Sequence, residues 1–418
     1  MDQTIMRQLI ARKRDGAELA GEDWAAIVHG FMGDTIDDAQ MAALAMACVW
    51  RGFTLEEAYA LTRAMVDSGE TLSFSGRTVV DKHSSGGVSD IVSMLVVPIV
   101  AACGVPVAKL SGRALGHTGG TIDKLEAIPG FNVDLSTDQF LRQVEQIGCA
   151  IAAQTQTFVP ADKRLYKLRD HTATVPSMGL MASSIVSKKI AGGAQAFVFD
   201  VKAGRAAFMP TPEEASVLAR WLVQIAARFQ RRAMAVVSDM NQPLGISIGT
   251  GIEVIEARDF LRGLLETPRA RELCLSVADT MLGVVAVSGG RALAQRALES
   301  GTAYEKFVEM VCAQGGTRAG LESMRVAEPI TQVCAERSGY IAGIDAVALG
   351  NAGRALSSSD SCAGIRVRVT VGDVTRRGDV LAEYCGAAET PAHIADSFTI
   401  GEDPVPPLPL VYGIVGEL

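Results

Sequence analysis

Charged, ring and hydroxyl side chains stand beside two glycines in residues 81–90, which read DKHSSGGVSD. Glycines let backbone N–H groups converge, hydroxyls donate hydrogen bonds, and the ammonium of Lys82 supplies positive charge, so this run could bind an anion such as phosphate. A helix that begins after the run would add the positive end of its dipole. A structural glycine turn explains the run equally well when it is taken alone, because short glycine motifs recur in unrelated proteins.

A second run of this kind lies at residues 109–124, which read KLSGRALGHTGGTIDK. It combines basic residues with three hydroxyls and four glycines, more than an ordinary turn requires. A second set of phosphate donors could therefore face the first across a cleft. For His117 we expect a hydrogen-bonded structural role and not a catalytic one.

Two further runs carry polar groups that could meet a ligand. Ser184 and Lys188 stand four residues apart in a predicted helix and share one face, so both could address one planar ligand, with the forked guanidinium of Arg169 as a further donor. Taken alone, that segment is more simply explained as a solvated basic helix end. Residues 200–209 (DVKAGRAAFM) follow a predicted strand, where open α/β sheets bind ligands, although an exposed turn without function fits them equally well.

The elements around these runs alternate between strand and helix patterns. Strands are predicted at residues 78–80, 105–110, 196–201 and 233–237, and helices between them include 137–147 and 212–229. We expect the first of these strands to end at Asp81. The alternation predicts an α/β sheet.

Both ends of the chain differ from this central pattern. Residues 1–68 have helical periodicity, and a capping box at Thr54–Glu57 begins the last of these helices. Residues 365–371 alternate strictly and predict a β-rich C-terminal part. The uncharged stretch 91–108 is interrupted by prolines and glycine, so we expect a buried helix followed by a buried strand and not a membrane span.

Composition limits the classes of protein to consider. The chain has 418 residues, with 39 Lys and Arg against 47 Asp and Glu, and a formal net charge of -8. An acidic surface repels phosphate backbones, so nucleic acid is not an expected partner, and neither is a membrane. Hydrophobic residues make up 48% and charged residues 21%, a globular balance. Eight scattered cysteines and an N-terminus without a long apolar stretch predict reduced thiols in a cytoplasmic protein.

The four runs, in this order and spacing, resemble the pyrimidine nucleoside phosphorylase family, which includes thymidine phosphorylase. The resemblance extends from the N-terminal helices to about residue 330. It implies a homodimer of α/β class, with a small all-α domain, a large α/β domain with a central mixed sheet, and a C-terminal β-rich α+β subdomain. The implied domains are residues 1–66 with 161–192, residues 67–160 with 193–335, and residues 336–418, with hinges near 67–80 and 152–160.

The resemblance also implies a reaction and a set of site residues. The reaction is reversible phosphorolysis of a pyrimidine nucleoside or deoxynucleoside, with inorganic phosphate as co-substrate and no required cofactor. Implied phosphate ligands are Lys82, Ser84, Ser93, Ser111 and Thr121. Implied catalytic residues are His83, Arg169 and Lys188, and implied substrate contacts are Leu115, Met181, Ser184 and Phe208 together with Arg169 and Lys188.

Several positions depart from the family pattern. Ser89 and Ile91 replace the usual Gly and Thr after the paired glycines, which weakens a monovalent cation site known in some relatives; its other positions fall on Leu244, Ser247 and Glu256, and Glu256 is the metal ligand we expect. His171 and Pro176 lie near Arg169, and Arg205 replaces a small residue. Residues 351–354 (NAGR) keep only part of a family turn.

These departures leave alternatives open. Arg205 and His171 could contact the extra anionic group of a nucleotide or a modified nucleoside, so both are candidate substrate contacts, although Arg205 could equally be a surface residue without a ligand. An anthranilate-type phosphoribosyltransferase shares the glycine-rich turn, but it would require Mg²⁺ and acidic ligands for it. A non-catalytic relative that only binds nucleosides would have no use for the phosphate donors Lys82, Ser84 and Ser111.

Overall fold

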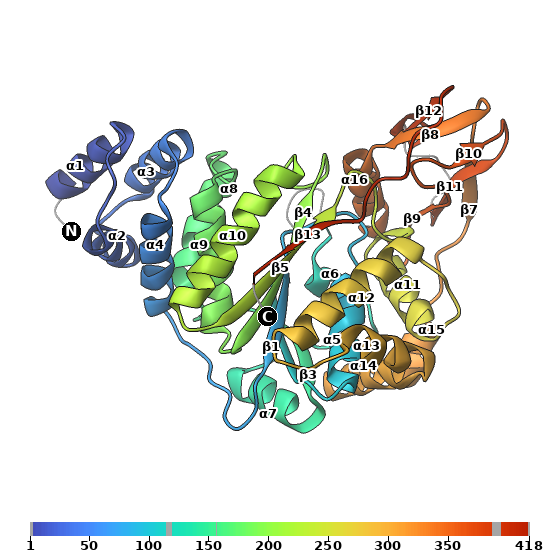
Figure 1. The fold of residues 1–418 in the computed structure, drawn as a ribbon, viewed down its shortest axis with the longest axis horizontal. Coiled ribbons are helices and arrows are strands. Elements are labelled where there is room, and N and C mark those ends of the chain that lie inside the picture. The colour runs from blue at the N-terminus through green and yellow to red at the C-terminus, as the bar shows by residue number, and fades with distance from the viewer. Residues whose placement is uncertain (1–2, 114–118, 156, 387–393, 417–418) are drawn as a thin grey trace.

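A helical bundle forms one end of the molecule. The computed structural model describes residues 3–113, 119–155, 157–386 and 394–416. Helices α1 to α4 form part of this bundle. Helices α8 and α9, which come much later in the chain, complete it by packing beside α4 (Figure 1). The bounds are α1 Gln3–Arg14, α2 Gly21–Met32, α3 Asp38–Arg51, α4 Leu55–Asp67, α8 Pro160–His171 and α9 Met178–Ala191.

The predicted capping box begins α4 and also connects helices of the bundle. Glu57 Oε2 accepts a hydrogen bond from the Thr54 N–H, and the Thr54 hydroxyl accepts one from the Glu57 N–H. The same carboxylate pairs with the buried ammonium of Lys13 at 2.6 Å. Glu57 therefore both caps α4 and joins it to α1 through the buried ion pair with Lys13.

A mixed sheet forms the centre of the molecule, with strand order β13-β5-β4-β1-β2-β3 in the described part of the chain. Strands β1 to β5 run parallel, and β13 is antiparallel to β5. The bounds are β1 Val80–Ser84, β2 Val107–Ser111, β3 Cys149–Ala153, β4 Ala196–Ala203, β5 Arg232–Asp239 and β13 Val411–Val415. This confirms the expected α/β class with a central mixed sheet.

Helices cover both faces of this sheet. In β4, Val198 packs in one apolar cluster with α5, α12 and α14, while its neighbour Phe197 packs in the other cluster with α10, because successive strand residues point to opposite faces. The remaining α/β helices are α5 Val92–Ala102, α6 Thr121–Leu125, α7 Thr137–Ile147, α10 Pro212–Arg228, α11 Gly251–Leu261, α12 Pro268–Gly283, α13 Gly290–Glu299, α14 Thr302–Ala313 and α15 Arg318–Ser323. Helix α5 is short and is followed by β2, as expected; no helix in the described ranges is long and apolar enough to cross a membrane.

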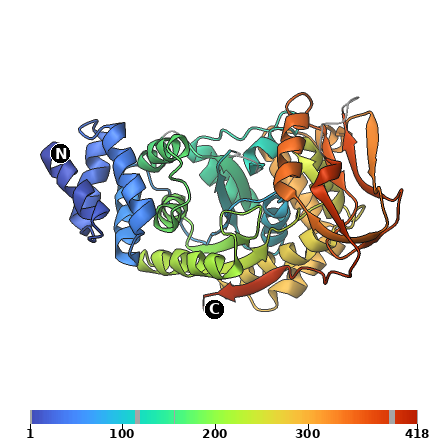
Figure 2. The ribbon, with the colours of Figure 1, turned by 90° about the horizontal axis from the view of Figure 1, so that it is seen from above.

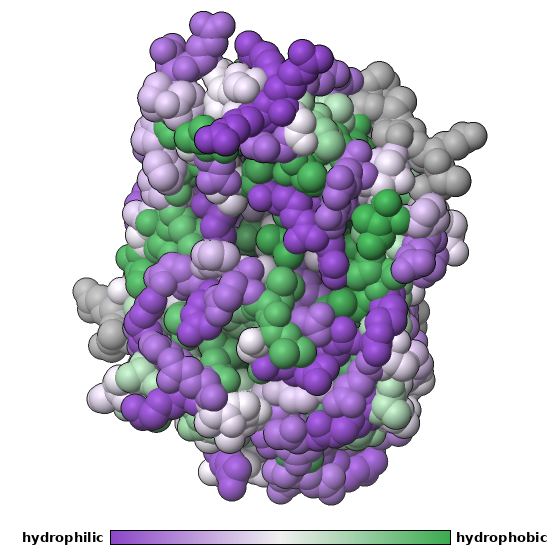
Figure 3. Space-filling model, turned by 90° about the vertical axis from the view of Figure 1, so that its right-hand side faces the viewer, coloured by the Kyte–Doolittle hydropathy of each residue, from purple (hydrophilic) through white to green (hydrophobic). Residues whose placement is uncertain are grey.

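The C-terminal subdomain lies at the end opposite to the helical bundle (Figure 2). Two sheets lie at this end, of order β6-β9-β11-β7 and β10-β8-β12, and β6 and β7 enter the first of them from before residue 336. Hydrophobic and hydrophilic surface alternate over this end (Figure 3). The bounds are β6 Ser247–Gly249, β7 Ile330–Cys334, β8 Gly339–Ile344, α16 Ala346–Ser357, β9 Gly364–Val367, β10 Val374–Thr375, β11 Val380–Cys385, the 3-10 turn Ala395–Ser397 and β12 Phe398–Gly401.

Two strand predictions differ from the structure. The first strand was expected to end at Asp81, but β1 continues to Ser84 because residues 80–84 pair in parallel with residues 196–200 of β4. Lys82 and His83 therefore lie on a strand and not in a turn. The alternating run 365–371 forms a strand only as far as Val367.

Candidate active site

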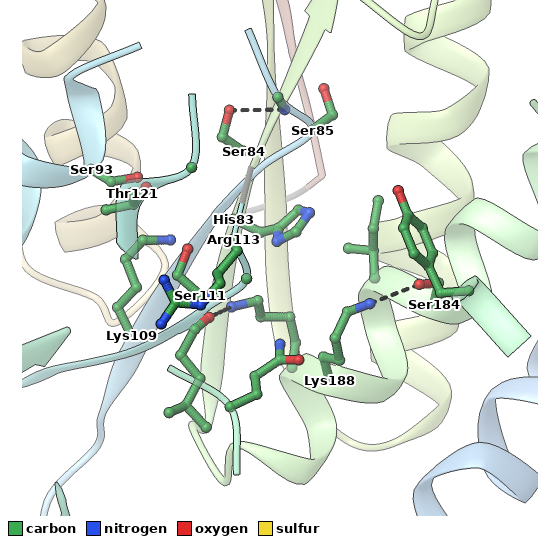
Figure 4. Close-up of a pocket in the computed structure, with 18 of the residues that line it drawn as sticks. His83, Ser84, Ser85, Ser93, Lys109, Ser111, Arg113, Thr121, Ser184 and Lys188 are labelled. Carbon is green, nitrogen blue, oxygen red and sulfur yellow. Dashed lines mark hydrogen bonds between the residues drawn. The ribbon is translucent and has the colours of Figure 1, made fainter. Parts of the chain in front are cut away.

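A cavity of about 660 Å³ opens where β1, β2 and β3 end and is closed on its other side by α8 and α9. Parallel strands bring their carboxyl ends to one edge of a sheet, which is why segments far apart in the sequence meet here. Many predicted site residues line it: His83, Ser84, Ser93, Ser111, Thr121, Met181, Ser184, Lys188 and Phe208. Ser93, Lys109 and Thr121 lie on one side, Ser184 and Lys188 on the other, and His83 between them (Figure 4).

The glycine-rich turn on the side of Ser93 and Thr121 is held by Asp90. Its Oδ2 accepts a hydrogen bond from the Ser84 hydroxyl at 2.6 Å, and its Oδ1 accepts one from the Val92 N–H at the start of α5. Positive charge on Lys202, Lys82 and Lys124 outweighs the desolvation of Asp90 and holds the pKa of this carboxyl far below its usual range. Asp90 is therefore ionised and fixes the turn that presents Ser84 to the cavity.

Lys82 lies beneath the cavity and does not line it. Its ammonium is fully buried, 3.0 Å from Asp200 Oδ2, and donates a long hydrogen bond of 3.4 Å to the Ser93 hydroxyl. Asp200 also pairs with Lys202 at 2.7 Å and accepts a hydrogen bond from Ser238. Burial lowers the pKa of Lys82, but Asp90 and Asp200 raise it by more, so the lysine stays charged. In this structure its ammonium contacts the cavity wall through the hydroxyl of Ser93.

Lys109 is a cavity residue that we did not single out from the sequence. Its side chain is 3% exposed, and Nζ donates to the Lys82 carbonyl at 2.9 Å. No ion pair joins Lys109 to a carboxylate in the described part of the chain, and burial together with the nearby Lys189 lowers its pKa to about 7. A bound anion would supply the missing negative charge. The sequence did contain one indication of its role. Lys109 lies near the end of an apolar predicted strand, where a buried lysine is unusual unless it binds a partner.

His83 stands between the two polar sides of the cavity. Burial, and then the positive charges of Lys189 and Lys109, hold its pKa well below the ordinary value. The ring is therefore neutral near pH 7, and one ring nitrogen can donate a hydrogen bond while the other accepts. His83 is therefore not an imidazolium near pH 7 and does not act as a charged proton donor.

Lys188 is held at the opposite side by two oxygens. Its ammonium donates to Asp162 Oδ2 at 2.6 Å and to the Ser184 hydroxyl at 2.7 Å. An ammonium has three N–H donors, so one can still address a ligand. Asp162, from α8, was not predicted, because its partner is 26 residues away on another helix.

Arg169 does not line the cavity in this structure. Its guanidinium is fully buried and donates to the backbone carbonyls of Thr174, Val175 and Leu180. Val175 lines the cavity, and so does Met181, which follows Leu180. Arg169 therefore holds the segment 174–180 that forms part of the cavity wall.

The other predicted contacts lie outside the cavity or outside the described residues. Arg205 points toward β8, since its Nη2 lies 3.4 Å from where a Cβ on Gly343 would be. His171 is exposed at the end of α8. Leu115 belongs to residues 114–118, which are outside the described ranges, as does His117.

Glu256 is buried in α11, away from the cavity. Its two oxygens accept hydrogen bonds from the N–H groups of Ile246 and Ser247. Burial raises its pKa to about 7. Among the described residues, no group of three or more His, Cys, Asp or Glu side chains is arranged to hold a metal ion.

Comparison with known proteins shows which family this chain belongs to. Family models described as "Glycosyl transferase family, a/b domain" and "Glycosyl transferase family, helical bundle domain" match residues 76–304 and 7–69. The chain is 44% identical to a pyrimidine-nucleoside phosphorylase of Geobacillus stearothermophilus over 90% of both chains. It is 45% identical to a thymidine phosphorylase of Sinorhizobium medicae, over 83% of this chain and 82% of that one.

A solved structure is similar in fold. The anthranilate phosphoribosyltransferase of Thermus thermophilus superposes with a TM-score of 0.57 at 21% identity, over 73% of this chain and 98% of that one. At that identity the likeness concerns the fold alone. The matches to the helical and α/β family models and to the curated phosphorylases identify this chain as a member of the pyrimidine-nucleoside and thymidine phosphorylase family of glycosyl transferases.

Proposed function

We propose that this protein catalyses the reversible phosphorolysis of a pyrimidine nucleoside or deoxynucleoside, giving the free base and a pentose 1-phosphate, with inorganic phosphate as co-substrate. The observation that carries the proposal is the arrangement of one cavity: hydroxyls and Lys109 on one side, Ser184 and Lys188 on the other, and a neutral His83 between them. The names of the relatives agree with it.

On the phosphate side, the cavity suits an oxyanion that attacks C1′ of the sugar. The hydroxyls of Ser84, Ser93, Ser111 and Thr121 line this side. Lys109 would then gain the negative partner it lacks. The Lys82 ammonium, which donates to the Ser93 oxygen, would leave the Ser93 hydroxyl proton free for the phosphate. The phosphate dianion in turn stabilises positive charge that develops on the sugar as the bond to the base breaks.

On the base side, negative charge develops on the departing pyrimidine. Lys188 and Ser184 can donate to its oxygens, and an ammonium prepared in a water-poor site stabilises such charge strongly. His83 is placed to donate a hydrogen bond to the base or the sugar while remaining neutral. Arg169, in this arrangement, is a positioning residue for the segment 174–180.

The substrate we propose is an uncharged nucleoside. The residue that suggested a charged substrate, Arg205, faces β8 and does not line the cavity. His171 is exposed at the surface.

The test is the release of free base from uridine and thymidine, followed by ultraviolet absorbance with and without inorganic phosphate. We expect release from at least one nucleoside only when phosphate is present. Base release without phosphate, or binding of nucleosides with no release at all, would refute the phosphorylase assignment.

The pH dependence of phosphate binding should reveal Lys109. Because its pKa is about 7 without an anion, the lysine loses its charge as the pH rises above that value. The phosphate KM of the wild type, divided by that of Lys109→Arg, should then rise by up to about tenfold per pH unit above neutrality, since arginine stays charged. The ratio cancels the titration of phosphate itself. A ratio that does not change from pH 6 to 9 would contradict this role.

We also propose that the protein is a homodimer that associates through α1 and α3. These helices pack together and expose Ile5, Met46 and Trp50, of which Trp50 is 81% exposed. Such apolar surface favours a partner. Light scattering after gel filtration should give a dimer for the wild type and a monomer for Trp50→Glu. The control is Leu264→Glu, which replaces another exposed apolar side chain, outside α1 and α3, and should remain dimeric. A monomeric wild type at micromolar concentration would refute the proposal.

The domain boundaries and the location complete the proposal. Packing of α8 and α9 on α4 supports a helical domain of residues 1–66 with 161–192, beside an α/β domain of residues 67–160 with 193–335. Strand β13 returns from the C-terminal subdomain, residues 336–418, to the central sheet. We propose a cytoplasmic location, which the eight free cysteines support.

A further inference from the structure

Ser89 connects the phosphate turn to a distant loop. Its side chain is buried, and its hydroxyl donates a hydrogen bond of 2.5 Å to the carbonyl of Ser247. The Ser89 carbonyl accepts a hydrogen bond from the Gly245 N–H, and the Val88 carbonyl accepts one from the Leu244 N–H. Three hydrogen bonds therefore join the end of the glycine-rich turn to residues 244–247.

The backbone of Ser89 is unusual for a residue with a side chain. Its φ is +57°, in the left-handed region that glycine adopts without cost. A non-glycine residue persists in such a conformation when its surroundings hold it there. The hydroxyl bond to Ser247 is the interaction that glycine at this position could not make.

These same residues occupy the positions where some relatives bind a monovalent cation, and they do not fit one. The Ser247 carbonyl accepts the Ser89 hydroxyl and each Glu256 oxygen accepts one backbone N–H, so the Ser89 hydroxyl stands against the carbonyl that a cation would use. A Cβ built on Gly245 would lie 2.6 Å from Glu256 Oε1 and 2.7 Å from Ser89 Oγ, so these oxygens pack tightly around the backbone. Ile91 offers a buried hydrocarbon side chain and no oxygen.

We propose that the Ser89 hydroxyl takes the structural place of the monovalent cation, so that this enzyme binds phosphate without one. Ser89 is a positioning residue: it precedes Asp90, which holds the Ser84 hydroxyl and the start of α5. A fixed Ser89 keeps Asp90 in place, and with it the turn that lines the phosphate side of the cavity. The inference deepens the proposed phosphorolysis by naming what orders its phosphate turn.

The first experiment uses the wild-type enzyme and does not depend on its activity. The melting temperature is measured in potassium chloride, sodium chloride and the chloride of a bulky organic cation, at equal ionic strength. The same melting temperature is expected in all three. A saturable rise with K⁺ or Na⁺ would overturn the proposal, even if the protein had no phosphorylase activity.

The second experiment removes the hydroxyl. Ser89→Ala keeps the strained backbone but not the bond, and the phosphate KM should rise roughly tenfold while the nucleoside KM stays within about twofold. A merely structural role would change neither KM selectively. The matched control is Ser323→Ala, which removes an exposed hydroxyl that also donates to a backbone carbonyl and should change neither constant. Equal changes in both KM values, or none, for Ser89→Ala would refute the proposal.

The third experiment rebuilds a cation site. In the double variant Ser89→Gly, Ile91→Thr, the hydroxyl is moved away from Ser247 and an oxygen is supplied at residue 91. Its melting temperature should rise with K⁺, and K⁺ should lower its phosphate KM toward the wild-type value. A folded double variant that ignores K⁺ would contradict the view that the Ser89 hydroxyl occupies a cation's place.

Discussion

Replacing Lys188 with methionine should lower kcat/KM for the nucleoside by about 10²- to 10³-fold, with most of the loss in kcat. Its ammonium is fixed by Asp162 and Ser184 and has one donor free for the departing base. The charge it stabilises develops as the bond to the base breaks, so the loss should fall on the transition state. Steady-state rates of base release at saturating phosphate measure it.

The control for this prediction is Lys167→Met, which removes an exposed lysine of α8 outside the cavity. Its kcat/KM should stay within about twofold of the wild type. If Lys188→Met raised the nucleoside KM and left kcat unchanged, Lys188 would bind substrate and transition state equally, and its catalytic role would be wrong.

Replacing Asp200 with asparagine should destabilise the protein by about 3–5 kcal/mol. Asp200 Oδ2 lies 3.0 Å from Lys82 and 2.7 Å from Lys202, and all three side chains are fully buried. In the variant, Asp90 would be the one carboxylate of the described residues left near the ammonium groups of Lys82 and Lys202. Positive charge would then stay buried without a partner, which is costly. Urea unfolding at pH 7 measures the loss, and the phosphate KM should rise because Lys82 is no longer held.

A second substitution tests the cause of that loss. Asp200→Asn combined with Lys202→Met removes one positive and one negative charge, so it should recover part of the stability lost in Asp200→Asn. The pH dependence gives the same information in the wild type. Lys202 and Lys82 outweigh desolvation and lower the pKa of Asp200 below the ordinary 3.8, so its stabilisation is complete above that pH and is lost as the pH falls further. A double variant no more stable than Asp200→Asn would contradict the charge argument.

Local sequence patterns predicted the elements that carry the site. The helices expected at 137–147 and 212–229 appear as α7 and α10, because capping residues and apolar periodicity act within one turn of the helix. The strand that carries Lys82 and His83 was predicted to end too early, at Asp81. It continues because its polar residues pair with β4, which lies more than a hundred residues later in the chain. Local patterns do not contain that pairing.

The same division applies to the site residues. Ser184 and Lys188 were predicted to share a helix face, and their 2.7 Å hydrogen bond follows from helical spacing alone. Arg169 was expected at the base, and the sequence did not indicate that the carbonyls of residues 174, 175 and 180 would use its donors.

By itself the sequence determined the chemistry available to this protein: a glycine-rich turn with hydroxyls, lysines and a histidine, and a helix with Ser184 and Lys188 on one face. The tertiary structure decided which of those groups reach the cavity and in what state of charge. Lys109 faces it with a lowered pKa, while Lys82 is buried against Asp200 and stays charged. The physical reason is that desolvation and charge pairing act over a few ångströms in space, between residues such as Lys82 and Asp200 that are more than a hundred positions apart in the chain.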